Sequence, residues 1–260
     1  MDMEMYDFTI DLIREAGHLL EKEKKENFSV AIKNDNPKNI VTSLDIKIGE
    51  FISNRIHETY SKHGIHNEEA KDTTGNEYLW TIDPIDGTSS FARGIPQYSI
   101  AIGLLRNNVP VLGAVLDPVA DELFSFRKGE GVWLNGEIIA PSRETELEKS
   151  FILLASGRKG DQFEWAGESL KKLLANVNKV KNFGSSALWL CYIASGRIEG
   201  AVAGTASTMD ISSAVGILNE AGGVITDKEG NSALLSTTGT RLYASNNQEI
   251  SSKLRKLLEH

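Results

Sequence analysis

The residues with the clearest chemical potential lie in TIDPIDGTSSF, residues 81–91. Asp83 and Asp86 are three residues apart, and Pro84 between them fixes φ and removes a backbone donor, which stiffens the turn that holds both. Two carboxylates held so closely repel each other, and a divalent cation between them relieves that repulsion. The backbone carbonyl of Ile85 is a further hard-oxygen ligand. The stretch is therefore a candidate for part of a metal site.

The end of the same stretch has the features of an anion site. Gly87 permits close backbone approach, and Thr88, Ser89 and Ser90 offer hydroxyl and N–H groups at an expected helix start. An ordinary capped turn explains an Asp-Gly-Thr-Ser sequence equally well. Both interpretations stay open on this stretch alone, so other acidic residues must decide between them.

Three other acidic segments are candidates, although each has an ordinary explanation. Glu68 and Glu69 precede the strand that leads to Asp83, but a glutamate pair is more often a solvated surface. Asp210 opens an expected helix and Asp45 lies near the start of another. Aspartate at a helix start is usually only a cap.

Two helices and a sheet of hairpins are expected to position these residues in the first half of the chain. Apolar residues at helical spacing predict helices over 8–20 and about 46–60, the second with Ser43 or Asp45 as possible N-cap. Short β-rich runs follow: YLWTI, YSIAIGLL, PVLGAVLD and ELFSF. The GEG sequence at 129–131 is interpreted as a turn, because no helix follows it.

Strands alternate with helices after Pro141. The expected strands are SFILLAS, NKVKNFG, IEGAVAG, GGVITD and RLYASNN, and the expected helices cover 161–176, 185–195, 210–221 and a C-terminal segment capped by Asn247. This alternation predicts a layered α/β half. We therefore expect an α+β half over residues 1–145 and an α/β half over residues 146–260.

Composition limits the classes of function. The formal net charge of -8 argues against nucleic acid as the main partner, because a phosphate backbone selects basic surfaces. No apolar run approaches the roughly 20 residues that a membrane-spanning helix needs, so no membrane partner is expected. The single cysteine, Cys191, cannot form an internal disulfide, and no charged-then-apolar signal precedes the first helix, which together favour the cytoplasm.

Other candidate chemistries find no support in the motifs. The histidines lack HExxH spacing, and His57, His63 and His66 are expected at the surface near a charged helix end. Cys191 lies on the apolar face of an expected helix, where burial is favoured over a nucleophilic role. There is no Walker loop and no dinucleotide fingerprint.

Taken together, the chain resembles the inositol monophosphatase family of metal-dependent phosphomonoesterases. DPIDGTSSF is similar to the first family signature, and MDISSAVGILNEAGG is similar to the second, an Asp that opens a small-residue helix ending in Ala-Gly-Gly. VTSLD, the Glu-Glu pair and a GSSA segment at 184–187 follow the family order. The resemblance spans essentially the whole chain. It implies a layered αβαβα sandwich, Mg²⁺ dependence, lithium sensitivity, a homodimer and a small phosphorylated substrate.

The resemblance also implies a set of metal ligands. Glu68, Asp83 and the Ile85 carbonyl would hold one Mg²⁺, and Asp83, Asp86 and Asp210 a second, with a third, weaker ion on Glu68 and water. Two ions about 4 Å apart can activate a water, stabilise the leaving oxygen and cancel charge on the phosphoryl group.

Roles in catalysis and substrate binding are implied in the same way. Thr88 and Asp45 would position or deprotonate the attacking water, with Glu68 as a further catalytic residue. Asp86, Gly87, Thr88 and Ser186 would contact the phosphate or the substrate. A catalytically idle, metal-responsive regulatory protein is the alternative from another class, but no ligand position and neither Thr88 nor Asp45 is missing.

Three departures from the family pattern concern the substrate. Ala203 replaces a glutamate that contacts ring hydroxyls in inositol-handling members, Met209 replaces a tryptophan, and Asn67 replaces a glycine. An inositol 1-phosphate type of substrate is expected first, with 3',5'-bisphosphonucleotides, histidinol phosphate and fructose 1,6-bisphosphate as alternatives. Arg158 and Lys159 either grip a second phosphate or lie in an exposed turn.

Overall fold

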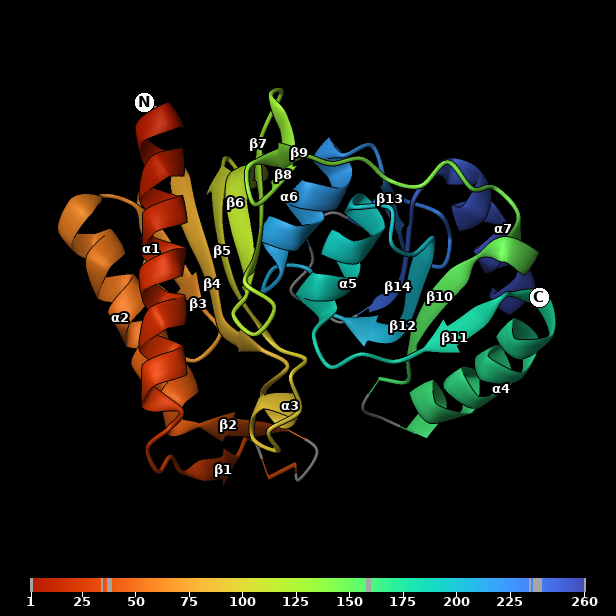
Figure 1. Ribbon diagram of the computed structural model, residues 1–260, viewed down its shortest axis with the longest axis horizontal. Helices are drawn as coiled ribbons and strands as arrows, with labels where there is room; N and C mark the ends of the chain where they lie inside the picture. Colours follow the sequence, from red (N-terminus) through yellow and green to blue (C-terminus); the bar gives the residue numbers. More distant parts are fainter. Residues whose placement is uncertain are drawn as a thin grey trace.

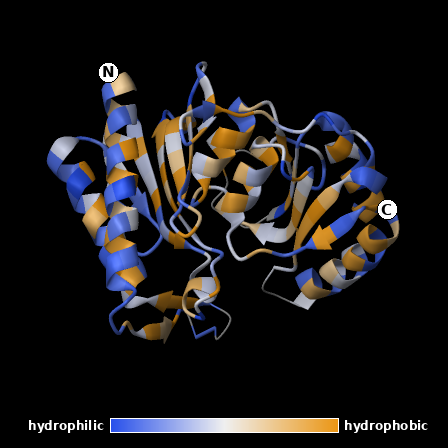
Figure 2. Ribbon diagram, viewed as in Figure 1, coloured by the Kyte–Doolittle hydropathy of each residue, from blue (hydrophilic) through white to orange (hydrophobic). Residues whose placement is uncertain are grey.

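The computed structural model describes residues 2–33, 35–36, 39–157, 160–233, 235 and 240–259. Its layers run helix, sheet, helix, sheet, helix from one side to the other (Figure 1). Hydrophobic residues gather on the strands and on the helix faces between the layers (Figure 2). The expected αβαβα sandwich is therefore confirmed. Arg158 and Lys159 lie outside the described residues.

The first of the two sheet layers is a seven-stranded sheet in the order β3-β4-β5-β6-β7-β8-β9. Its strands are β3 Gly64–Asn67, β4 Tyr78–Asp86, β5 Ser99–Arg106, β6 Val109–Asp117, β7 Glu122–Arg127, β8 Gly131–Leu134 and β9 Glu137–Ile138. Within this sheet β3 and β4 pair in parallel, and the other neighbouring strands pair antiparallel. Helices α1 (Asp2–Glu23) and α2 (Ser43–Thr59) cover one face of this sheet, and the hairpin of β1 (Val30–Ile32) and β2 (Ile40–Thr42) leads into α2 (Figure 1).

The remaining elements build the second half. Strands β10 (Phe151–Ala155), β11 (Lys179–Lys181), β12 (Gly200–Ala206), β13 (Val224–Thr226) and β14 (Thr240–Ser245) form a sheet in the order β11-β10-β12-β14-β13. Helices α5 (Ser186–Ala194) and α6 (Ser212–Glu220) lie between the sheets, and α4 (Gly160–Asn176) and α7 (Gln248–Glu259) lie outside. Short helices α3 (Thr88–Phe91) and η1 (Leu147–Lys149) complete the set. The division into two domains near residue 145 stays a prediction.

Two helix starts differ from the sequence-based expectation. The N-cap of α2 is Thr42 rather than Ser43 or Asp45: its hydroxyl accepts from the helix backbone, while Asp45 accepts from the Thr42 N–H in a capping box. Helix α6 begins at Ser212, two residues after Asp210. Asp210 is therefore not a cap, and its carboxylate is available for other contacts.

The histidine expectation was right for one residue and wrong for two. His57 is exposed on α2. His63 instead stacks on Tyr60 and Tyr78 and accepts a hydrogen bond from Trp80 Nε1 at 3.0 Å. His63 lies in the turn between α2 and β3, where it packs against the start of β4; His66, on β3, is treated with the site below. Cys191 is buried, as predicted, and no helix in the described ranges is long and apolar enough to cross a membrane.

Glycines in the first sheet allow α6 to approach closely. A Cβ on Gly103 would lie 2.7 Å from Thr81 Oγ1 and 2.9 Å from Ser212 Oγ, and one on Gly113 would lie 2.9 Å from Ser213 Cβ. Thr81 Oγ1 and Ser212 Oγ hydrogen-bond at 2.5 Å. This contact fixes the segment that carries Asp210 beside β4.

Candidate active site

Strand β4 presents Asp83 and Asp86 on the same side because of a bulge. Asp83 pairs with Ala101 of β5 and Asp86 with Ser99, so β4 has one more residue than its partner between these pairs. Residues three apart on a regular strand face opposite sides, and one inserted residue brings them to the same side. The carboxylate of Asp83 accepts the N–H of Ile85 at 3.1 Å across Pro84.

The carboxylate of Asp86 is buried against the start of α5. It accepts from the hydroxyl of Ser185 at 2.6 Å, from the N–H of Ala187 at 2.6 Å and from the hydroxyl of Ser186 at 3.1 Å. The GSSA segment thus contacts a predicted metal ligand, and Ser185 was not anticipated from the sequence. The next residue, Gly87, has φ 99°, and a Cβ there would lie 2.8 Å from a backbone oxygen, so glycine is required.

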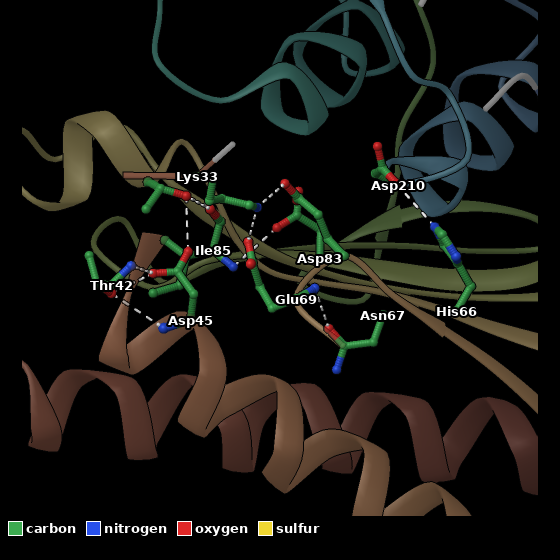
Figure 3. Close-up of polar contacts among 11 residues, drawn as sticks. Lys33, Thr42, Asp45, His66, Asn67, Glu69, Asp83, Ile85 and Asp210 are labelled. Atoms are coloured by element: carbon green, nitrogen blue, oxygen red, sulfur yellow. Dashed lines mark hydrogen bonds and ion pairs between the residues drawn. The ribbon is translucent and has the colours of Figure 1, made fainter. Parts of the chain in front are cut away.

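Thr88 and Asp45 form a direct pair, as the resemblance implied. The Thr88 hydroxyl lies 2.9 Å from Asp45 Oδ1 and 3.0 Å from the Ile85 carbonyl. The other oxygen of Asp45 accepts from the N–H and the hydroxyl of Thr42 (Figure 3). Burial raises the pKa of Asp45, while the bonds from Thr42 and Thr88 oppose that rise.

Glu68 and Glu69 are adjacent in the sequence but differ in exposure to solvent. Glu68 is partly exposed and Glu69 is nearly buried, and Lys33 from the β1–β2 hairpin contacts both, at 3.2 and 2.6 Å. Burial would lower the pKa of Lys33, but the two glutamates outweigh it and raise that pKa. Lys33 was not anticipated from the sequence, because a three-residue strand leaves no periodic signal.

Asp210 reaches the site from the other half of the chain. Its Oδ1 lies 3.1 Å from His66 Nε2, and Nδ1 of the same ring lies 2.8 Å from Asp72 Oδ1 (Figure 3). Burial opposes ionisation of Asp210, yet bonds from His66 and Ser207 lower its pKa. The bond to Asp210 raises the pKa of His66. The surface expectation for His66 is therefore wrong: its side chain is 20 % exposed.

The electrostatics of the site suit a divalent cation. Burial raises the pKa of Asp83 well above its ordinary value. Neighbouring carboxylates raise it further: Glu68, Asp86 and Asp210. Burial raises the pKa of Asp86 to about 6, although its three hydrogen bonds oppose that rise. Hard oxygen donors that repel one another in a buried place are the donor set that Mg²⁺ binds.

These carboxylates do not yet converge on one point. Within the described part of the chain, no three Asp, Glu, His or Cys side chains form a ready metal site. Lys33 and His66 contact the two outermost carboxylates, Glu68 and Asp210. Glu68 also hydrogen-bonds to the Asp83 carboxylate, and the ligand assignment stays a prediction.

The three departures from the family pattern have clear positions. Ala203 is buried on β12 and, with Ser186 and Trp189, lines an apolar cavity of about 10 Å³. Asn67 donates to Ser53 Oγ and caps the N–H of Glu69 at 3.0 Å. Met209 lies in the turn before α6. A larger open groove of about 410 Å³ beside α3 includes none of the site carboxylates in its lining.

Comparison with known proteins agrees with this geometry. The model of the inositol monophosphatase family matches residues 1–260. The "Fructose-1,6-bisphosphatase/inositol-1-monophosphatase" of Thermotoga maritima is 32% identical over 89% of this chain and 88% of its own length. The extragenic suppressor protein suhB of Bartonella henselae superposes with a TM-score of 0.92, at 28% identity, over 98% of both chains. SaIMPase-II of Staphylococcus aureus, solved with inositol monophosphate bound, gives a TM-score of 0.81 at 25% identity over 98% of this chain and 94% of its own.

Fold and comparisons together define a phosphomonoester hydrolase of the inositol monophosphatase type. The chain belongs to the inositol monophosphatase family, whose members depend on Mg²⁺. The resemblance stated from the two signatures is thereby confirmed.

Proposed function

We propose that this protein hydrolyses a small phosphate monoester, with inositol 1-phosphate as the preferred candidate, by attack of a water molecule in a site that holds two or three Mg²⁺ ions. The supporting observation is the bulge in β4, which places two buried carboxylates side by side next to the Thr88–Asp45 pair. A buried pair of like charges destabilises a fold, so its presence indicates a functional site.

The metal ligands in this proposal are those implied by the resemblance. Glu68, Asp83 and the Ile85 carbonyl would hold one ion, and Asp83, Asp86 and Asp210 would hold the second. When bound, Mg²⁺ would lower the pKa of a water molecule and neutralise charge on the phosphoryl oxygens.

Thr88 and Asp45 handle the proton of the attacking water. The Thr88 hydroxyl can donate to Asp45 Oδ1 at 2.9 Å, which turns the lone pairs of that hydroxyl toward the site. Thr88 then accepts a hydrogen bond from the water and orients it, while Asp45 is held by the two donors of Thr42. Glu68 is proposed to take part in the same step. The backbone N–H groups of Gly87 and Thr88 are proposed to donate hydrogen bonds to the phosphate.

The resemblance places the leaving group near Ala203, where this chain lacks a charged acceptor. Ala203 packs among apolar side chains, and the lining of its cavity also includes Ser186, which donates to Asp86. A lining of this kind supports the alternatives beside inositol 1-phosphate: fructose 1,6-bisphosphate, 3',5'-bisphosphonucleotides and histidinol phosphate. The first of these agrees with the double name of the Thermotoga maritima relative.

We further propose a cytoplasmic homodimer. The cytoplasm is supported by cysteine usage, and the dimer by the resemblance alone. Size-exclusion chromatography with light scattering tests the dimer, since a monomer at micromolar concentration contradicts it.

Phosphate release from the four named compounds, with Mg²⁺ and with a chelator, tests the proposed reaction. We expect Mg²⁺-dependent release, with one compound turned over well above the others. A folded protein that binds Mg²⁺ but releases no phosphate from any of them would contradict the proposal. That outcome would favour the metal-responsive regulatory alternative.

A further inference from the structure

Both ring nitrogens of His66 are engaged by carboxylates that lie far apart in the sequence. Nε2 lies 3.1 Å from Asp210 and Nδ1 lies 2.8 Å from Asp72. Carboxylates only accept hydrogen bonds, so each contact requires an N–H on the ring nitrogen concerned. Figure 3 shows the imidazole reaching from β3 to Asp210. One side chain thus connects the seven-stranded sheet with the segment that leads into α6.

Asp72 is held in place by the backbone around it. Ile65 and Thr73 form an antiparallel bridge, with hydrogen bonds of 3.2 and 2.9 Å between their backbone groups. This bridge returns the chain beside β3 and places Asp72 next to His66. Asp72 is largely exposed, whereas His66 is mostly buried, so the pair orients the ring from its solvent side.

Asp210 has further support from the elements packed around it. Ser207 donates to its carboxylate, and the Thr81–Ser212 hydrogen bond fixes the backbone two residues further on. The parallel register places His66 opposite Thr81. Two adjacent strands therefore hold the same segment, one through a hydroxyl pair and one through an imidazole.

We propose that His66, oriented by Asp72, is a positioning residue for Asp210: its Nε2–H restrains the carboxylate through Oδ1 and so favours the orientation in which that carboxylate binds a divalent cation. A carboxylate on two rotatable bonds loses freedom when it binds a metal, and a hydrogen bond that already restricts it reduces this loss. The inference deepens the proposed function and rests on it, because it takes Asp210 as a ligand.

A purely electrostatic role for His66 predicts the opposite sign. A positive imidazole beside Asp210 would repel a cation, so its removal would tighten metal binding. Positioning predicts that removal weakens binding. The direction of the change therefore separates the two roles.

Calorimetric titration of the full chain with Mn²⁺ and Mg²⁺ tests the inference. Asp210→Asn identifies the ion concerned, because this variant should fail to bind it. His66→Leu should bind the same ion about tenfold more weakly than the wild type does. His66→Gln should restore most of the affinity, because its amide can donate to Asp210, and Asp72→Asn should give a smaller loss. His57→Leu, on the exposed face of α2, is the matched control and should bind as the wild type does. The Mg²⁺ concentration for half-maximal turnover should rise in His66→Leu, with kcat at saturating Mg²⁺ changed by no more than a few-fold.

Unchanged or tighter binding in His66→Leu overturns the inference. If Asp210→Asn loses an ion while His66→Leu binds normally, this inference alone fails and the proposed function stands. If Asp210→Asn binds metal like the wild type, Asp210 is not a ligand and both fail. Should His66→Leu not fold, the metal affinities of His66→Gln and Asp72→Asn decide. An Asp72→Asn variant that binds metal as tightly as the wild type contradicts the role of Asp72 in orienting His66.

Discussion

Replacing Asp86 by asparagine should stabilise the protein in the absence of metal. Burial raises the pKa of Asp86 from 3.8 to about 6, so at pH 8 the folded state must ionise a group that resists ionisation. The difference corresponds to ~3 kcal/mol of unfolding free energy. Asparagine can keep the contacts, with its oxygen toward Ser185 and Ala187 and its amide toward Ser186.

The sign of the pH dependence follows from proton binding. Between pH 3.8 and about 6 the folded protein holds the Asp86 proton and the unfolded chain has lost it. The unfolding free energy of the wild type therefore falls as pH rises through this window. Asp86→Asn removes that fall, so the two proteins should be close in stability at pH 4 and differ most at pH 8.

Thermal unfolding in chelator from pH 4 to pH 8 measures this effect. A change of 1 kcal/mol shifts the midpoint of a chain of this size by about 2–4 °C, so we expect Asp86→Asn to melt roughly 6–12 °C higher at pH 8. Added Mg²⁺ should then stabilise the wild type more than the variant, which keeps the three ligands proposed for the first ion. Asp117→Asn is the control, because Asp117 is buried at the end of β6, outside the site; the response of this variant to Mg²⁺ should match that of the wild type. A variant less stable than the wild type at pH 8, or a difference equal at pH 4 and pH 8, would refute the reasoning.

Three further predictions concern a hydroxyl of the site, a glycine contact beside it and a surface ion pair. Thr88→Val should lower kcat by about 10²–10⁴ without unfolding the protein, while Thr88→Ser should retain most activity; equal rates for both would remove the hydroxyl from the mechanism. Gly103→Ala should destabilise the protein by ~1–3 kcal/mol in chemical denaturation, because its Cβ would press on Thr81 and Ser212, whereas Gly167→Ala, with open space around it, should be neutral or slightly stabilising. Arg197→Lys should cost at most about 1 kcal/mol in the same assay, because it replaces a two-point contact with Glu122, made at 2.6 Å on each side, on a partly exposed surface; a larger loss would contradict that estimate.

Local patterns account for most of what could be predicted. The two amphipathic helices, the α/β alternation and the Asp83–Asp86 motif depend on residues close in sequence, and each is present in the structure. The pairing of Thr88 with Asp45, 43 residues apart, came from the family resemblance and not from spacing. Sequence periodicity gives no information about contacts between residues so far apart in the chain.

The unpredicted residues depend on non-local geometry. His66 reaches Asp210 only because β3 pairs in parallel with β4 and because glycines let α6 approach the sheet. Lys33 reaches Glu68 from a hairpin of two three-residue strands. Neither the parallel pairing of a short strand nor a hairpin contact leaves a repeating pattern in the sequence.

The most direct test of the account is the Mg²⁺ dependence of phosphate release by the wild type and by Asp83→Asn. Asp83 is buried, interacts with three other carboxylates and is the proposed bridge between two ions. We predict that release by the wild type requires Mg²⁺ and that Asp83→Asn, folded by circular dichroism, retains less than about one thousandth of the rate. Near-normal release by the variant, or release by the wild type in chelator, would contradict the proposed site.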